Sequence, residues 1–336
     1  MIDAGMEGML ERMAEKMITV ITPCYNGFRY MGHYFDSLEH QTFRNFRVII
    51  VDDCSTDDSY DRLLEYKNNS TLDITILHND TNQKQGYSRQ VGAKAVTTEW
   101  MCFCDCDDWY EPDFLDKMLV KAESTGADMV MCHFNYVYAD GTKRYLQGLD
   151  ILSDGSSQEE YLAYTPMSLC RFIIRAELFQ NLNVPQINSA EDGAVTPQLL
   201  AKSKKTVIIH EGLYNYFIRD DSMSAVPNPQ IYKDFIIAQG VIDKEIGDRF
   251  PKECEYIGIK NICYGAVLNA LKADVEIRDI ASCYRLFHSA HPGWYKNPYK
   301  KALDRKKKVF LFFLHLRMYR ILKIYAILHQ KVTHRK

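Results

Sequence analysis

The sequence lacks the long apolar runs and the cysteine patterns that mark two large classes of protein. No uncharged apolar stretch approaches the roughly 18 to 20 residues that cross a bilayer as a helix. The ten cysteines are scattered singly or alternate along one apolar run, without a Cys-x-x-Cys pair or a histidine at zinc-ligand spacing. These absences argue against an integral membrane protein and a zinc site, and they predict buried, reduced thiols in a cytoplasmic protein.

A secretory signal is also missing from the start of the chain. Residues 1–16 mix Glu, Arg, Lys and Met without an apolar core, so we expect no export signal and interpret them as an N-terminal extension. No internal repeat or low-complexity tract is visible. A chain of 336 residues, of which 46% are hydrophobic, can bury one large core divided into two or three subdomains.

Negatively charged residues are scarce in the last part of the chain, which is strongly basic. Residues 299–336 carry twelve Lys or Arg against one Asp, although the formal net charge of the whole chain is -3. The remainder is therefore acidic, which argues against a nucleic-acid-binding core. Within residues 305–331, an amphipathic helix is predicted over 309–328, with Arg317, Arg320 and Lys323 on one stripe. This helix could lie on an anionic membrane surface or pack on the rest of the chain, and the sequence favours neither.

Short apolar runs that end abruptly in polar residues predict buried parallel strands. They cover residues 18–22, 47–51, 74–77, 100–104 and 128–132. Helical patterns lie between them at 30–40 and 56–67, the second with Ser55, Thr56 or Asp57 as its cap. This alternation predicts a doubly wound α/β sheet. Ligands of such sheets bind beyond the carboxyl ends of the strands, so the residues that follow each run are expected to converge on one crevice.

An acidic cluster, Asp105, Asp107 and Asp108, follows the fourth run. Three carboxylates within four residues repel one another, and a bound cation would relieve that repulsion. Oxygen ligands favour Mg²⁺ or Mn²⁺ over zinc. A solvated acidic turn is the alternative, but the position after a buried strand favours a site.

A second acidic pair, Asp52 and Asp53, follows the second run and could accept hydrogen bonds from a base or a ribose. Pro23 and Tyr25, which follow the first run with Asn26, could form a flat wall against a nucleobase. Pro23 could instead simply end its strand.

Several segments, in this order, resemble glycosyltransferase family 2. They are Thr22–Asn26, Gln41–Phe43, Val51–Asp57, Gly86–Gly92 and Asp105–Asp108, with Gln90 standing where that family usually has Asn. The resemblance covers residues 18 to about 224 and implies a GT-A fold with a mixed sheet flanked by helices. It also implies inverting transfer from a nucleoside diphosphate sugar, usually UDP-linked.

The resemblance also implies roles for individual residues. Pro23, Tyr25, Asp53 and Arg89 would contact the uridine, and Asp105 the ribose. Asp107 and Asp108 would face a Mn²⁺ or Mg²⁺ ion, and either of the two is open as its direct ligand. Asn26 and Asp52 are expected in the same donor crevice. Residues 214–224 resemble a segment near the diphosphate, where Arg219 would neutralise phosphate.

A catalytic base is implied by residues 188–193, which resemble the family's Glu-Asp motif. Asp192 would deprotonate the acceptor hydroxyl, with Glu191 beside it. An N-capping acidic pair before a helix over 195–201 is an equally good interpretation.

These observations predict a nucleotide-sugar-binding half at 17–140, an acceptor-binding half at 141–229 and a C-terminal helical region at 230–336. The expected function is non-processive transfer of a hexose or N-acetylhexosamine to a glycan or lipid-linked acceptor of surface polysaccharide. The motif Gln-x-x-Arg-Trp of the family's processive members is absent. The alternatives are a nucleotidyltransferase, which would need a Gly-rich loop where Pro23–Asn26 stands, and an inactive sugar-nucleotide-binding scaffold. A glycoside hydrolase, which also uses paired carboxylates, is a less favoured alternative.

Overall fold

The computed structural model describes residues 17–145, 151–219 and 229–333. The extension predicted at 1–16 lies outside these described residues. The chain divides into two compact units that are interleaved along the sequence. The sheet unit contains residues 17–156, 168–186 and 202–219, and the helical unit contains residues 157–167, 187–201 and 229–336 within the described ranges. The predicted functional halves, with boundaries at 140/141 and 229/230, stay predictions.

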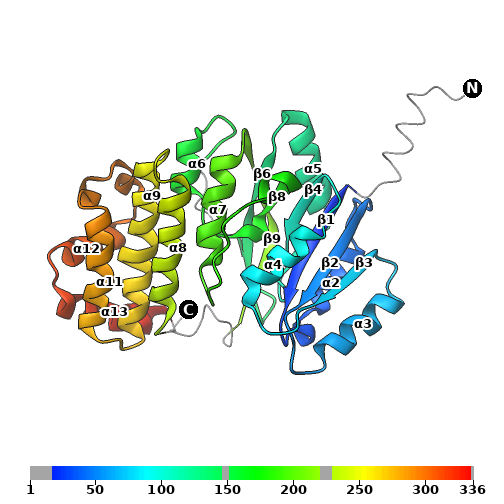
Figure 1. The fold of residues 1–336 in the computed structure, drawn as a ribbon, viewed down its shortest axis with the longest axis horizontal. Helices are drawn as coiled ribbons and strands as arrows, with labels where there is room; N and C mark the ends of the chain where they lie inside the picture. Colours follow the sequence, from blue (N-terminus) through cyan, green and yellow to red (C-terminus); the bar gives the residue numbers. More distant parts are fainter. Residues whose placement is uncertain (1–16, 146–150, 220–228, 334–336) are drawn as a thin grey trace, which may run out of the picture. The chain divides into compact units, whose positions relative to one another are not determined.

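The described part of the sheet unit forms one nine-stranded mixed sheet (Figure 1). The strands are β1 Ile18–Cys24, β2 Phe46–Asp52, β3 Ile74–His78, β4 Trp100–Phe103, β5 Trp109–Tyr110, β6 Met129–Tyr138, β7 Lys143–Tyr145, β8 Phe172–Arg175 and β9 Thr206–Ile218. Their order is β3-β2-β1-β4-β8-β6-β9-β5, with β7 paired to β6. Strands β3, β2, β1 and β4 are parallel to one another, and β8 runs antiparallel to both of its neighbours, β4 and β6.

The five predicted apolar runs are all strands. Every residue of β1 is buried, as expected for a parallel strand covered on both faces. The helices of this unit are α2 Gly32–Glu39, α3 Ser59–Asn69, α4 Lys84–Lys94 and α5 Phe114–Thr125, with 3₁₀ turns at Phe28–Tyr30, Leu169–Arg171 and Ala176–Phe179. Because α4 packs on β1 and β2, it holds its side chains close to the carboxyl ends of these strands. The predicted mixed α/β sheet is therefore confirmed.

Of the three caps predicted for α3, Ser55 and Thr56 are wrong. The helix begins at Ser59, and Asp58 precedes it without a side-chain capping bond. The Asp57 carboxylate instead accepts from the Ser59 N–H at 3.0 Å. Ser55 and Thr56 bind Asn26 in the neighbouring loop, so their hydroxyl groups are used in tertiary rather than local contacts.

The helical unit consists of short helices around a core of its own. They are α6 Gln158–Tyr164, α7 Glu191–Lys202, α8 Ile231–Ile246, α9 Pro251–Gly258, a π-helical segment Ile259–Ala266, α10 Val267–Lys272, α11 Ile277–Ala290, α12 Arg305–His315 and α13 Tyr319–Thr333, with 3₁₀ turns at Trp294–Lys296 and Pro298–Ala302. Trp294, Phe310 and Leu322 are among the fully buried side chains of the core. The predicted C-terminal helical region is confirmed.

The basic end is two helices rather than the single helix predicted over 309–328. Arg317 has a φ of 56°, and the Met318 N–H returns to the Phe313 carbonyl, which closes α12 before α13 begins. Lys323, predicted on the basic stripe, donates to the Leu271 carbonyl at 2.8 Å and pairs with Asp274. One side of α13 therefore packs on the unit. Within the described ranges, no helix has the length and apolar character needed to cross a membrane.

Candidate active site

The acidic cluster forms the loop between β4 and β5, and its three carboxylates have different environments. The side chain of Asp105 is 33% exposed and pairs with Arg89 at 2.7 Å. The side chain of Asp107 is 21% exposed and pairs with Arg219 at 2.5 Å. Asp108 is fully buried. The structure thus pairs Asp105 with Arg89 and Asp107 with Arg219, while the ligand contacts predicted for these residues stay predictions.

Asp108 connects the acidic loop to β9. One carboxylate oxygen accepts from the Tyr214 hydroxyl, and the other accepts from the Phe217 N–H at 2.8 Å. Burial raises the pKa of Asp108 well above its usual value, and the charges of Asp107 and Asp105 raise it further. Both oxygens of this side chain are engaged inside the protein.

Asp107 lies closer to solvent. Burial raises the pKa of its carboxyl, as does the charge of Asp105, while the Arg219 guanidinium opposes the shift. Arg219 follows β9 directly and stacks on the Tyr30 ring, with 3.9 Å between the guanidinium carbon and the ring centroid. The predicted phosphate ligand and the predicted metal ligand therefore form an ion pair with each other.

Arg89 reaches the loop from α4 with only 2% of its surface exposed. The helix can lie this close to β1 because Gly92 faces the strand. A Cβ atom at Gly92 would stand 2.5 Å from the Ile21 Cγ2 atom. The glycine that ends the Gly86–Gly92 segment thus allows the close approach that positions Arg89.

The loops after β1 and β2 are joined by Asn26, which has a φ of 51°. Its N–H donates to the Ser55 hydroxyl at 2.9 Å, and its Oδ1 accepts from the Thr56 N–H at 2.8 Å. Tyr25 is 47% exposed beside it, whereas Pro23 is buried within β1 opposite Val51. Pro23 therefore does not end its strand.

The two carboxylates after β2 bind the neighbouring loops. Asp53 accepts from the Asn79 side chain and from the N–H groups of Gln83 and Lys84, all at 2.8 to 2.9 Å. Asp52 accepts from the Ser55 N–H and the His78 ring through one oxygen. Its Oδ1 is buried without a hydrogen-bond partner in the described part of the chain.

The sequence did not predict which residues hold the loops of the site in place. Gln41 is 2% exposed, donates to the Glu111 carbonyl and accepts from the Leu115 N–H, so it fixes the segment that follows the acidic loop. Tyr214 and Tyr30 were likewise given no role. Gln41 lies in a segment that resembles the family, which was the available signal.

A metal ion would obtain few ligands from the protein alone. Among the residues that the structure describes, no group of three or more His, Cys, Asp or Glu side chains is arranged to hold one. An ion beside Asp107 would need further oxygen ligands from a bound diphosphate and water.

Glu191 and Asp192 belong to the helical unit and occupy the first turn of α7. Glu191 is buried and Asp192 is partly exposed. The preceding loop is held by Asp234, which accepts from the Ser189 N–H at 3.1 Å. The alternative interpretation, an N-capping pair ahead of a helix over 195–201, is wrong in its bounds, because α7 already begins at Glu191 and contains both residues. The N-terminal end of a helix still favours negative charge there. The role of Asp192 as base stays a prediction.

Residues 19–182 match the model of glycosyl transferase family 2. The chain contains a family 2 glycosyltransferase domain. Among curated proteins, it is 26% identical over 227 residues to glycosyltransferase GlyA of Streptococcus pneumoniae, covering 64% of this chain and 32% of GlyA. It is 25% identical over 209 residues to the putative teichuronic acid biosynthesis glycosyltransferase TuaG of Bacillus subtilis, covering 62% of this chain and 82% of TuaG. The chain spans only 32% to 38% of the length of the first curated relatives that it matches.

The solved structure of S. aureus TarS residues 1–349 in complex with UDP-GlcNAc resembles this chain with a TM-score of 0.72 and 18% sequence identity. The similarity covers 94% of this chain and 92% of the TarS chain. At this identity the comparison establishes the fold, and the predicted GT-A architecture is confirmed.

Proposed function

We propose that this family 2 domain transfers a sugar with inversion from a UDP-sugar to a hydroxyl of a glycan or lipid-linked acceptor in surface polysaccharide synthesis. The observation that carries the proposal is the acidic loop, where Asp105 and Asp107 each pair with an arginine at the carboxyl ends of parallel strands. The TarS structure with UDP-GlcNAc supports the donor class. The name of TuaG supports a role in polysaccharide synthesis.

The donor is proposed to bind with its uracil near Tyr25 and Asp53 and its ribose near Asp105. Its diphosphate would reach Arg219, which exchanges the Asp107 carboxylate for phosphate oxygens. This exchange is favourable because a guanidinium binds phosphate in the same bidentate geometry as a carboxylate. It would release Asp107 to face the diphosphate.

We also propose that Asp107, rather than Asp108, would ligate Mn²⁺ or Mg²⁺. Both oxygens of Asp108 are already engaged by β9, while Asp107 is the more exposed of the two. The oxygen donors and the raised pKa of Asp107 fit a hard divalent cation. When bound, the ion would supply positive charge for the departing diphosphate.

The reaction itself needs one displacement. Asp192 accepts the proton of the acceptor hydroxyl as that oxygen forms a bond to the anomeric carbon. The bond between the anomeric carbon and the diphosphate oxygen breaks, and UDP leaves with the electron pair. Arg219 stabilises the charge that develops on UDP.

A cytoplasmic location belongs to the same proposal. All ten cysteines are free, and eight of them are buried. Burial raises the pKa of the Cys102 and Cys132 thiols to about 12, which makes them unreactive.

The test is UDP release from UDP-glucose, UDP-galactose, UDP-GlcNAc and UDP-GalNAc in the presence of Mn²⁺. We expect release from at least one donor, and a loss of roughly a hundredfold or more in kcat in Asp107→Asn, because charge stabilisation of the leaving group is removed. Asp116→Asn is the matched control, since Asp116 is exposed on α5. No release from any donor would support the inactive scaffold instead, and full activity of Asp107→Asn would refute the metal assignment.

A further inference from the structure

A buried arginine of the sheet unit has no hydrogen-bond partner. Arg171 ends the 3₁₀ turn before β8, and only 1% of its surface is exposed. Its Nε and both terminal nitrogens are buried without a hydrogen-bond partner in the described part of the chain. Burial lowers the pKa of Arg171 to about 10, so the guanidinium stays charged near neutral pH. A buried charge without a partner is costly, and its retention indicates a ligand or another function.

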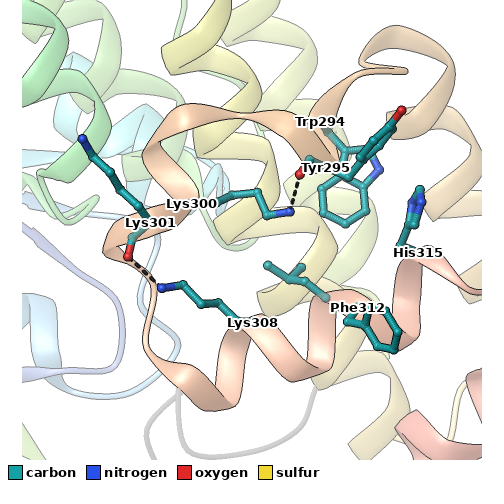
Figure 2. A pocket seen from close by; sticks show the side chains of 8 residues that line it. Trp294, Tyr295, Lys300, Lys301, Lys308, Phe312 and His315 are labelled. Carbon is teal, nitrogen blue, oxygen red and sulfur yellow. Dashed lines mark hydrogen bonds between the residues drawn. The ribbon is translucent and has the colours of Figure 1, made fainter.

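Arg171 differs from the cationic side chains at two other sites of the protein. Arg89, which is almost as deeply buried, pairs with an aspartate of the acidic loop. In the cavity of about 460 Å³ in the helical unit, Lys300 and Lys308 each donate to a backbone carbonyl at 2.7 to 2.8 Å (Figure 2). Arg171 instead stacks on the Phe134 ring, with 4.3 Å between the guanidinium carbon and the ring centroid. This contact satisfies none of its N–H donors.

The position of Arg171 connects it to the proposed donor site. Strand β8 is antiparallel to β4, with Ile173 opposite Cys102, so the start of β8 lies where β4 leads into the acidic loop (Figure 1). In the proposed donor pose, the uracil lies at the ends of β1 and β2, and the ribose lies at Asp105 after β4. Strand β8 follows β4 in the sheet order. A sugar beyond the nucleotide would therefore lie near Arg171.

An aromatic ledge lies beside Arg171. It consists of Phe134 and Tyr136 on β6 and Tyr216 on β9, whose rings meet edge to face with 5.3 to 6.4 Å between their centroids. The register pairs Phe134 with Tyr214, which places both side chains on one face of the sheet, and Tyr214 binds Asp108 of the acidic loop. The three rings of the ledge are only partly buried. Flat apolar side chains around a few polar groups are typical of small-ligand sites.

We infer that the proposed transferase acts on a hexuronic acid, carried by the donor or by the acceptor, whose carboxylate binds Arg171 while its ring lies on the aromatic ledge. A guanidinium binds a carboxylate through two parallel hydrogen bonds. The single charge of a carboxylate matches that of Arg171, whereas a phosphate monoester would bring about two charges. The guanidinium is enclosed in the structure, so Phe134 or Tyr136 must move to admit the carboxylate. The inference rests on the proposed function, because it names a substrate class for the same site.

The experiment compares neutral and acidic sugars that differ only at C6. Calorimetric titration of the full chain with UDP-glucose and UDP-glucuronate, and with the corresponding galactose pair, tests the donor. UDP release from a neutral donor in the presence of methyl glucoside or methyl glucuronide tests the acceptor. We expect a roughly tenfold or larger preference for the uronate in one of the two arms, which is the size of one charge-assisted hydrogen bond.

Two arginines of β8 and its preceding turn supply the variant and its matched control. Arg171→Met should lose the preference for the uronate, and its Tm without ligand should equal or exceed that of the wild type, because an unpaired buried charge is removed. Arg175→Met should keep the preference, since Arg175 lies at the other end of β8 and pairs with Glu99. Circular dichroism verifies that both variants are folded.

The outcomes separate this inference from the proposed function. Binding of UDP and of neutral UDP-sugars without a uronate preference in either arm would overturn the inference alone. A preference that survives in Arg171→Met, or a lower Tm of this variant with its preference unchanged, would assign Arg171 a structural role and also overturn it. Failure to bind UDP or any UDP-sugar would refute the proposed function, and the inference with it.

Discussion

Asp107 and Asp108 are adjacent in the sequence, yet the structure gives them different tasks. Asp108 is buried and holds β9 through Tyr214 and Phe217, whereas Asp107 is partly exposed and pairs with Arg219. The sequence predicted both as metal ligands and left open which one is direct. The deciding contact is with Tyr214, which lies 106 positions beyond Asp108. A local motif therefore identifies the acidic loop but not the orientation of each carboxylate.

Replacing the two aspartates should separate stability from activity. Asp108→Ala leaves the Tyr214 hydroxyl and the Phe217 N–H buried without their acceptor, and each orphaned group costs about 1 to 3 kcal/mol. We expect the free energy of unfolding to fall by about 2 to 4 kcal/mol. Asp107→Ala should change it by less than about 1 kcal/mol, because the residue is partly exposed and its removal relieves repulsion.

Urea unfolding followed by circular dichroism measures both variants, with Asp116→Ala as the exposed control. The midpoint should shift without a change in the m-value. A larger loss of stability in Asp107→Ala than in Asp108→Ala would contradict these assignments.

Asn26 and Asp53 show the same limit of sequence reasoning. Both were predicted as donor-binding residues, and that role stays a prediction. Their hydrogen bonds join the loops after β1 and β2 and fix the turn before α4. Residue type alone could not reveal these structural tasks, because their partners lie in neighbouring loops of the folded sheet.

At the scale of elements, α4 shows how a short sequence pattern positions a side chain. Arg89 reaches Asp105 because Gly92 lets the helix lie against Ile21 and Val51 of the sheet. The apolar runs predicted the strands, because a buried parallel strand must be apolar on both faces. The break between α12 and α13 was not predicted, because the backbone of Arg317 adopts a left-handed conformation without a glycine to signal it.

Gly92→Ala should destabilise the protein although alanine favours helices. The added methyl group would stand 2.5 Å from Ile21 Cγ2, and overpacking of this kind costs about 1 to 3 kcal/mol. The higher helix propensity of alanine offsets at most about 1 kcal/mol of this cost. We therefore expect unfolding free energy to fall by about 1 to 2 kcal/mol, as measured by thermal or urea unfolding.

Gly32→Ala is the matched control, because nothing lies within 4 Å of the Cβ position at the start of α2. It should be neutral or slightly stabilising. If both variants lost the same stability, the close approach of α4 to β1 would not be the cause.

At the scale of the whole molecule, the two compact units are interleaved in the sequence. The sheet unit is completed by β8 and β9, which follow segments that belong to the helical unit. Periodicity predicts each element separately, but it cannot say which distant segments share a core. The sequence therefore predicted the mixed sheet and the C-terminal helices, while the return of β9 to the acidic loop had to be seen in the structure.

Calorimetric titration of the full chain with UDP, with and without Mn²⁺, tests most directly whether the acidic loop is a UDP-sugar site. We predict one UDP bound per chain, tighter with Mn²⁺ than without it, and loss of this metal effect in Asp107→Asn but not in Asp116→Asn. Absence of UDP binding, or a Mn²⁺ effect that survives unchanged in Asp107→Asn, would contradict the account.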